Sequence, residues 1–165
     1  MGRVTETPAS VREASRTQRG LVAGVIAGAA VVGLLIGIGR RSGTAWRPVN
    51  AAAHGILGMK ADGVWSYHGS VTPTGGLVVL VLCAMAGFIV ARIAPTFRTL
   101  HVATTAAGVA LMGYLLHVHV VSRTPGGLAA LLTVGEMRGL YVTLGLALIA
   151  GMRFAFLPIA KSSEH

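Results

Sequence analysis

Charged side chains are scarce in this sequence, and acidic ones are the scarcest. Asp, Glu, Lys and Arg together make up 12% of the 165 residues, five of them acidic, whereas 53% of the residues are apolar. The mean hydropathy is +0.71. A soluble domain is about 25% charged, so the composition excludes an ordinary water-soluble fold and indicates a membrane protein.

Cysteine and aromatic residues are also few. Cys83 is the one cysteine, so the chain alone can form neither a disulfide nor a multi-thiolate metal site. The net charge is +9, but most Arg and Lys residues flank apolar runs, and no basic patch interleaved with aromatic residues accompanies them. We therefore predict the lipid bilayer as the partner, and no nucleic acid.

Four apolar runs separate the few charges, and each is close to the length of about 20 residues with which a helix crosses a bilayer. The runs cover residues 20–39, 75–91, 102–121 and 138–157. Arg40 and Arg41 directly follow the first run, which predicts an uncleaved span rather than a signal peptide. The fold class predicted is an all-α, polytopic membrane protein, a four-transmembrane-helix bundle.

The remaining segments complete the predicted layout. Residues 1–19 are polar without apolar periodicity and are expected to form a mobile or weakly helical tail. Residues 20–160 form a single four-span membrane domain, followed by a C-terminal tail, 161–165. Residues 128–134 are apolar but too short to span, so they are either the first turn of the fourth span or a short interfacial helix.

The distribution of Lys and Arg predicts the sidedness. Four spans place both termini on one side, with eight of the 14 Lys and Arg residues. The other six lie opposite, namely Arg40, Arg41, Arg47, Lys60, Arg123 and Arg138. The positive-inside rule then predicts cytoplasmic termini and a longer exoplasmic first loop. The bias towards Arg, Ala, Gly and Val favours a bacterial inner membrane.

Glycines recur at four-residue spacing in the first span. Gly20, Gly24 and Gly28 form one stack, and Gly33 and Gly37 form a second. This spacing places each stack on one face of a helix, where small residues let two backbones approach closely. The partner is either a helix of the same chain or a helix of another copy or another membrane protein.

Most side chains that could do chemistry fall on the side opposite the termini. Imidazole and carboxylate groups suit zinc, iron or copper, and the candidate ligands here are His54, Asp62, His68, His117, His119 and Glu136. The alternative is that these histidines are hydrogen-bonded structural residues. His117 and His119 lie about 200° apart on a regular helix, so both cannot face one ion.

Haem is not expected within this chain alone. The first, second and fourth apolar runs contain no histidine. His101 and His117 are sixteen residues apart, a rise of about 24 Å on one helix, which is too far for one haem. No cofactor is predicted, and a transition metal is the alternative.

One loop segment resembles a known pattern. Pro48, Asn50, His54 and Gly58 follow the order Pro-apolar-Asn-x3-His-x3-Gly. This segment is similar to one between the first two spans of certain small uncharacterised four-helix bacterial membrane proteins, a resemblance that implies no activity. In a helix, Asn50 and His54 share a face, so the amide could orient the imidazole. Alternatively, Asn50 caps a short interfacial helix.

Three hypotheses for function follow. The leading one is a small accessory or structural membrane protein that binds other helices, or a second copy, through its Gly-rich first span. The second is a metal or catalytic site on the exoplasmic face. The third is a small-molecule transporter. It would have to be formed by oligomers, because four short spans without an ionisable group at mid-bilayer leave little room for a pathway within one chain. An enzyme is the less favoured class.

Overall fold

The computed structural model describes residues 9–94 and 98–155, which form helices and no strand. Four helices are long: α1 (Ala9–Arg41), α5 (Val71–Ile93), α6 (Thr99–His119) and α8 (Val134–Phe154). Each contributes to a segment long and apolar enough to cross a membrane. The predicted all-α fold with four candidate spans is therefore confirmed.

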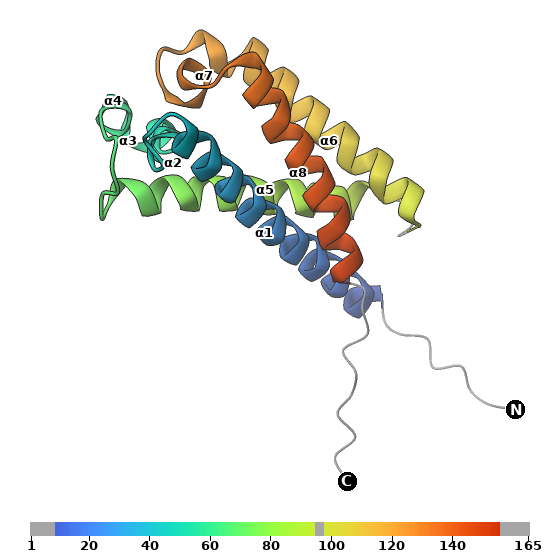
Figure 1. The fold of residues 1–165 in the computed structure, drawn as a ribbon. Helices are drawn as coiled ribbons and strands as arrows, with labels where there is room; N and C mark the ends of the chain where they lie inside the picture. Colours follow the sequence, from blue (N-terminus) through green and yellow to red (C-terminus); the bar gives the residue numbers. More distant parts are fainter. Residues whose placement is uncertain (1–8, 95–97, 156–165) are drawn as a thin grey trace, which may run out of the picture.

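Short helices gather at one end of the long ones, which we call the loop end (Figure 1). They are α2 (Arg47–Ala52), α3 (His54–Leu57), α4 (Met59–Asp62), the 3-10 helix η1 (Val121–Arg123) and α7 (Gly127–Leu131). Helix α1 begins and α8 ends at the opposite, terminal end. Among the described residues, the two ends of the bundle therefore differ, because a cap of short helices lies at the loop end only.

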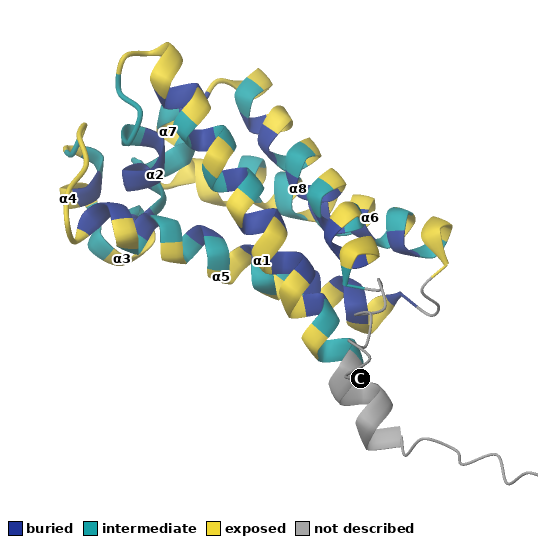
Figure 2. Ribbon diagram, turned by 60° about the horizontal axis from the view of Figure 1, so that its bottom comes forward, coloured by how far each residue is buried: buried dark blue, intermediate teal, exposed yellow. Residues whose placement is uncertain are grey.

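Helix α1 is the centre of the packing. It lies against both α5 and α8, and α6 packs mainly on α8 and makes few contacts with α5. Ala23, Ala27, Val31 and Leu35 lie on the inner face of α1 and are buried, and Figure 2 shows such buried positions recurring along the long helices. The bundle is therefore tight around α1 and loose between α5 and α6.

The first glycine stack packs inside the chain. A Cβ atom added at Gly24 would overlap the carbonyl oxygen of Cys83 and lie 2.5 Å from the Cα atom of Ala84. On α5, a Cβ atom added at Gly87 would lie 2.7 Å from the backbone nitrogen of Gly24. These glycines therefore let α1 and α5 touch backbone to backbone.

The second glycine stack has no such partner. A Cβ atom added at Gly33 or Gly37 would meet no atom within 4 Å. Both residues are exposed on α1. The two stacks have the same four-residue spacing in the sequence. Within the described residues, only the first packs against another helix.

The boundaries of two elements differ from their predicted limits. Helix α1 already begins at Ala9, so it includes the polar residues 9–19 of the predicted tail. Helix α7 ends before α8 begins, because Thr133 caps α8 in a capping box with Glu136. Most of the segment 128–134 is thus a separate short helix. Residues 1–8 and the predicted tail 161–165 lie outside the described residues.

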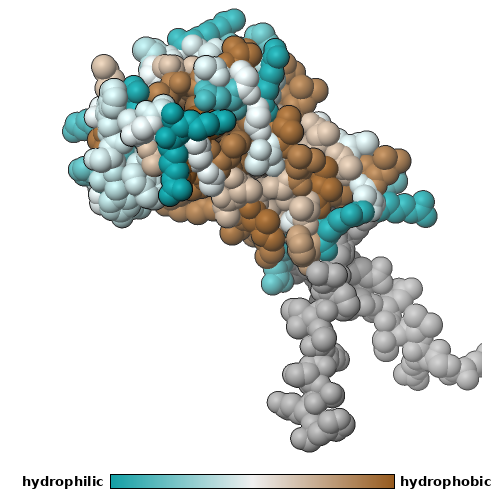
Figure 3. Space-filling view, in the orientation of Figure 1, coloured by the Kyte–Doolittle hydropathy of each residue, from teal (hydrophilic) through white to brown (hydrophobic). Residues whose placement is uncertain are grey.

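The surface agrees with a membrane environment. Figure 3 shows apolar side chains across the middle of one face and hydrophilic ones towards the two ends. Leu77, Leu82, Leu111 and Leu146 are all exposed on the long helices. Such an apolar surface suits lipid and would be costly in water. These features support a multi-pass membrane protein.

Candidate functional site

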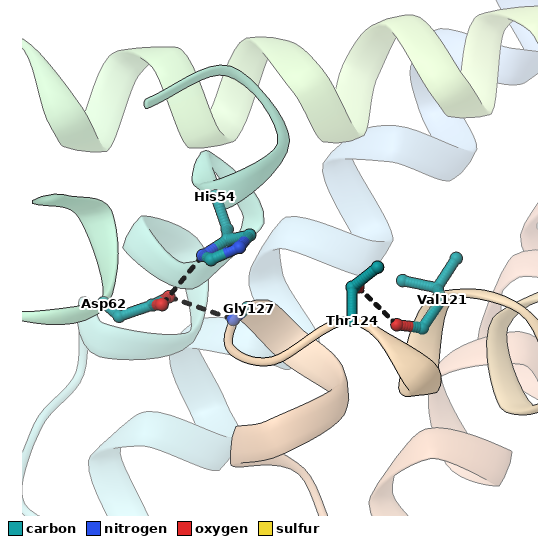
Figure 4. Close-up of polar contacts among 5 residues, drawn as sticks. All are labelled: His54, Asp62, Val121, Thr124 and Gly127. Carbon is teal, nitrogen blue, oxygen red and sulfur yellow. Dashed lines mark hydrogen bonds and ion pairs between the residues drawn. The ribbon is translucent and has the colours of Figure 1, made fainter. Parts of the chain in front are cut away.

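The carboxylate of Asp62 connects two parts of the cap at the loop end (Figure 4). Its Oδ2 atom lies 2.7 Å from Nδ1 of His54, and its Oδ1 accepts a hydrogen bond of 3.0 Å from the backbone nitrogen of Gly127. The carboxylate thus connects α3 and α4 of the first loop to α7, 65 residues away. Sequence analysis proposed His54 and Asp62 as ligands, and the structure brings these two together.

The backbone of Gly126 and Gly127 lies close to this pair. Gly126 and Gly127 have φ angles of +96° and +68°, which glycine adopts without strain and which let the backbone approach Asp62. Among the described residues no Ser, Thr or Cys side chain hydrogen-bonds to His54. A catalytic triad needs such a nucleophile within reach of the imidazole, and the described residues place none in hydrogen-bond contact with His54.

Asn50 neither orients His54 nor caps a helix, and both expectations are wrong. It lies inside α2 and is fully buried. Its Nδ2 atom donates to the carbonyl oxygens of Val64 and Ser66, both at 2.9 Å, and its Oδ1 accepts from Thr72 Oγ1 at 2.7 Å. Both amide donors are therefore used to hold the loop after α4 against α2 and the start of α5.

The other proposed ligands are engaged separately. His68 Nδ1 lies 3.2 Å from the hydroxyl of the neighbouring Ser70, and Glu136 accepts the backbone N–H of Thr133 in the capping box. His119 is exposed, on a different side of α6 from His117. No three His, Cys, Asp or Glu side chains of residues 9–94 and 98–155 lie together as metal ligands.

An apolar cavity lies between α5 and α6. Its volume is about 790 Å³, within the usual range of ligand sites. α1 and α8 form its back, and its length follows α5 from Val79 to Ile93, a rise of about 21 Å. Leu82, Met85 and Met112 line it and are each more than half exposed. The cavity therefore opens sideways, towards lipid.

His117 and Tyr141 stand in the wall of this cavity. Nδ1 of His117, on α6, lies 3.0 Å from the hydroxyl oxygen of Tyr141, on α8. A Cβ atom at Gly113 would lie 2.9 Å from the Tyr141 ring, so the absence of a side chain at Gly113 makes room for that ring. Nε2 of His117 is buried and has no hydrogen-bond partner among the described residues.

Counting unsatisfied groups assigns the protons of this pair. If Tyr141 donates to Nδ1, the hydroxyl and Nδ1 are both satisfied, and one group, the Nε2–H of His117, lacks a partner. If Nδ1 donates instead, both the Tyr141 hydrogen and the Nε2 lone pair lack partners. An unsatisfied buried group costs about 1–3 kcal/mol, so we assign Tyr141 as the donor. The cavity wall then holds one free N–H.

Sequence analysis selected His117 but missed Tyr141. The signal for Tyr141 is a hydroxyl inside an apolar span, where a polar group needs a partner. A second missed feature is the capping box, which the order Thr133-x-x-Glu136 before an apolar run would have predicted. That motif explains why the Glu136 carboxylate is hydrogen-bonded to Thr133 at the start of α8.

Comparison with known proteins adds no family to this description. No family model matches the chain, and no curated protein and no solved structure is significantly similar to it. The geometry of the cavity and of its polar pair must therefore carry the functional argument.

Proposed function

We propose that the protein binds a membrane-dissolved, apolar molecule that carries a hydrogen-bond-accepting oxygen. The single observation behind the proposal is the unpartnered Nε2 atom of His117, assigned above as N–H, in the wall of a largely apolar cavity. An apolar body fits the cavity, and a carbonyl oxygen satisfies the free donor. The molecule enters from the bilayer between α5 and α6.

Binding requires a local change at the wall. Nε2 is covered by neighbouring side chains, so a rotamer change of the imidazole or of its neighbours must expose it to the ligand. Met85, Met112 and Leu116 line the cavity, and methionine in particular is flexible and adapts its shape to what it contacts. A pocket lined in this way accepts molecules of one chemical class with different outlines.

Benzophenone is a suitable probe, because its carbonyl is both the hydrogen-bond acceptor and the photoreactive group. The purified protein in phosphatidylcholine nanodiscs is illuminated with increasing benzophenone, and the labelled residues are identified by mass spectrometry. We expect saturable labelling at Met85 and Met112. His117→Phe should weaken it about fivefold, because about 1 kcal/mol of hydrogen bonding is lost.

Two controls make this test specific. His119→Phe changes an exposed histidine of the same helix that does not line the cavity, and it should leave labelling unchanged. Diphenylmethane has nearly the shape of benzophenone without the carbonyl, and it should compete poorly. Equal labelling of the two histidine variants, or labelling spread evenly over lipid-facing residues without saturation, would contradict the proposal.

A second candidate function is the accessory role in helix interaction. The open second stack, Gly33 and Gly37, supports it, because nothing within 4 Å of either position occupies the space of a side chain. The double variant Gly33→Leu, Gly37→Leu tests it in membranes by chemical crosslinking. A smaller crosslinked assembly would favour the accessory role, and an unchanged one would count against it.

The membrane and the sidedness also belong to the proposal. We place the protein in a bacterial inner membrane with its terminal end in the cytoplasm, on the Lys and Arg distribution described above. Single cysteines introduced at Ser66 and at Thr99 into a Cys83→Ala background test the sidedness. Labelling of Ser66→Cys, and not of Thr99→Cys, by an impermeant maleimide on intact cells is expected.

A further inference from the structure

We infer that a second, smaller groove between α6 and α8 binds an anionic membrane phospholipid. The groove has a volume of about 490 Å³. Ala107, Ala110 and Gly145 line it with small side chains, and Leu111, Val142 and Leu146 line it with larger apolar ones. It follows α8 over the twelve residues from Arg138 to Ile149, a rise of about 16 Å. Its length and lining fit an acyl chain.

One end of the groove carries a cation. Arg138 is exposed at the loop end, one turn after α8 begins, where a span reaches the level of the headgroups. Its Nε atom donates to the hydroxyl of Tyr114 at 3.5 Å, a long contact that holds the guanidinium beside the groove. No carboxylate of the described residues pairs with it. The guanidinium nitrogens Nη1 and Nη2 can therefore fork onto a phosphate.

A lipid fits this site better than a second copy of the chain. A copy packed alongside in the same orientation would have to offer Arg138 an acid from its own loop end, and the two loop-end carboxylates are already engaged. Asp62 is bound to His54 and Gly127, and Glu136 is bound to Thr133. A phospholipid supplies both an apolar chain for the groove and a free negative charge for Arg138.

Native mass spectrometry of the full chain in neutral detergent tests this inference. The protein is mixed with phosphatidylglycerol or with phosphatidylcholine of the same acyl chains, and bound lipid is counted. One Arg near the headgroups should favour the anionic lipid about fivefold. Arg138→Gln should reduce phosphatidylglycerol binding to the phosphatidylcholine level. Gly145→Leu, which fills the groove, should reduce the binding of both lipids.

Matched controls separate this site from general surface charge. Arg123→Gln removes another cation of the loop end that does not line the groove, and it should keep the lipid preference. Loss of preference in both Arg variants, or in neither, would overturn the inference. Displacement of phosphatidylglycerol by inorganic phosphate alone would also overturn it, because the acyl chain would then contribute nothing.

Arg138→Gln should leave benzophenone labelling of the α5–α6 cavity unchanged, so each proposal can fail without the other.

Discussion

Helix α5 carries two stripes of residues with the same sequence spacing. One stripe packs closely against α1, and the other lines the open cavity. Leu80, Ala84, Gly87 and Ala91 lie towards α1, where a Cβ atom on Gly20, Gly24 or Gly28 would overlap them. Leu82, Ala86, Ile89 and Ile93 repeat this spacing two residues later and line the cavity. An offset of two residues is about 200° on a helix, so the stripes lie on opposite sides.

The difference shows where this bundle is rigid and where it can accept a guest. On the α1 side, small residues bring two backbones into contact, and no space is left for a molecule between them. On the cavity side, large side chains project into an opening that no helix of the described residues fills. We therefore expect stability to depend on the first face and ligand binding on the second.

The largest effect should come from adding one methyl group on the close-packed face. In Gly24→Ala the new Cβ meets the backbone of Cys83 and Ala84, which cannot move aside without separating the helices. We expect a loss of about 3 kcal/mol in the free energy of unfolding, measured by denaturant titration in detergent micelles. Gly33→Ala is the matched control. It meets nothing within 4 Å and should be neutral or slightly stabilising.

This contrast also explains how far the sequence could predict the fold. The four apolar runs were visible because hydropathy and length suffice to mark a span. The sequence does not predict that Gly24 packs against α5 while Gly33 has no neighbour. The same four-residue spacing marks a possible interface in both stacks without naming the partner. The partner is set by how α5 crosses α1, which depends on contacts between residues about 60 positions apart.

The candidate site was predictable only in part for the same reason. His117 is a candidate from the sequence because imidazole is a metal-ligand type and the residue falls on the same predicted membrane face as the other candidates. Its partner Tyr141 lies on another span, and the packing of α6 on α8 brings the two together. The pairing of His54 with Asp62 likewise depends on three short helices whose breaks at Ala53 and Gly58 no periodicity of the sequence indicates.

A smaller effect is expected where the loop is fixed to the start of α5. Asn50→Ala removes two donors from the carbonyl oxygens of Val64 and Ser66 and an acceptor from Thr72. Loss of these buried hydrogen bonds should cost about 2 kcal/mol and should speed proteolysis within residues 63–70. Asn50→Asp keeps the acceptor for Thr72 and loses both donors. Unchanged proteolysis in both variants would show that another contact holds this loop.

The smallest effect should come from a larger side chain on the cavity face. Ala86 is half-buried and lines the cavity, so a Leu side chain there can extend into the cavity, and the free energy of unfolding should change by less than about 0.5 kcal/mol. The same substitution at Ala91, which is fully buried beside Gly20, should cost about 1–3 kcal/mol through overpacking. Equal costs in the two variants would mean that the faces of α5 do not differ in packing. A neutral Ala86→Leu that nevertheless lowers benzophenone labelling would separate binding from stability on a single helix.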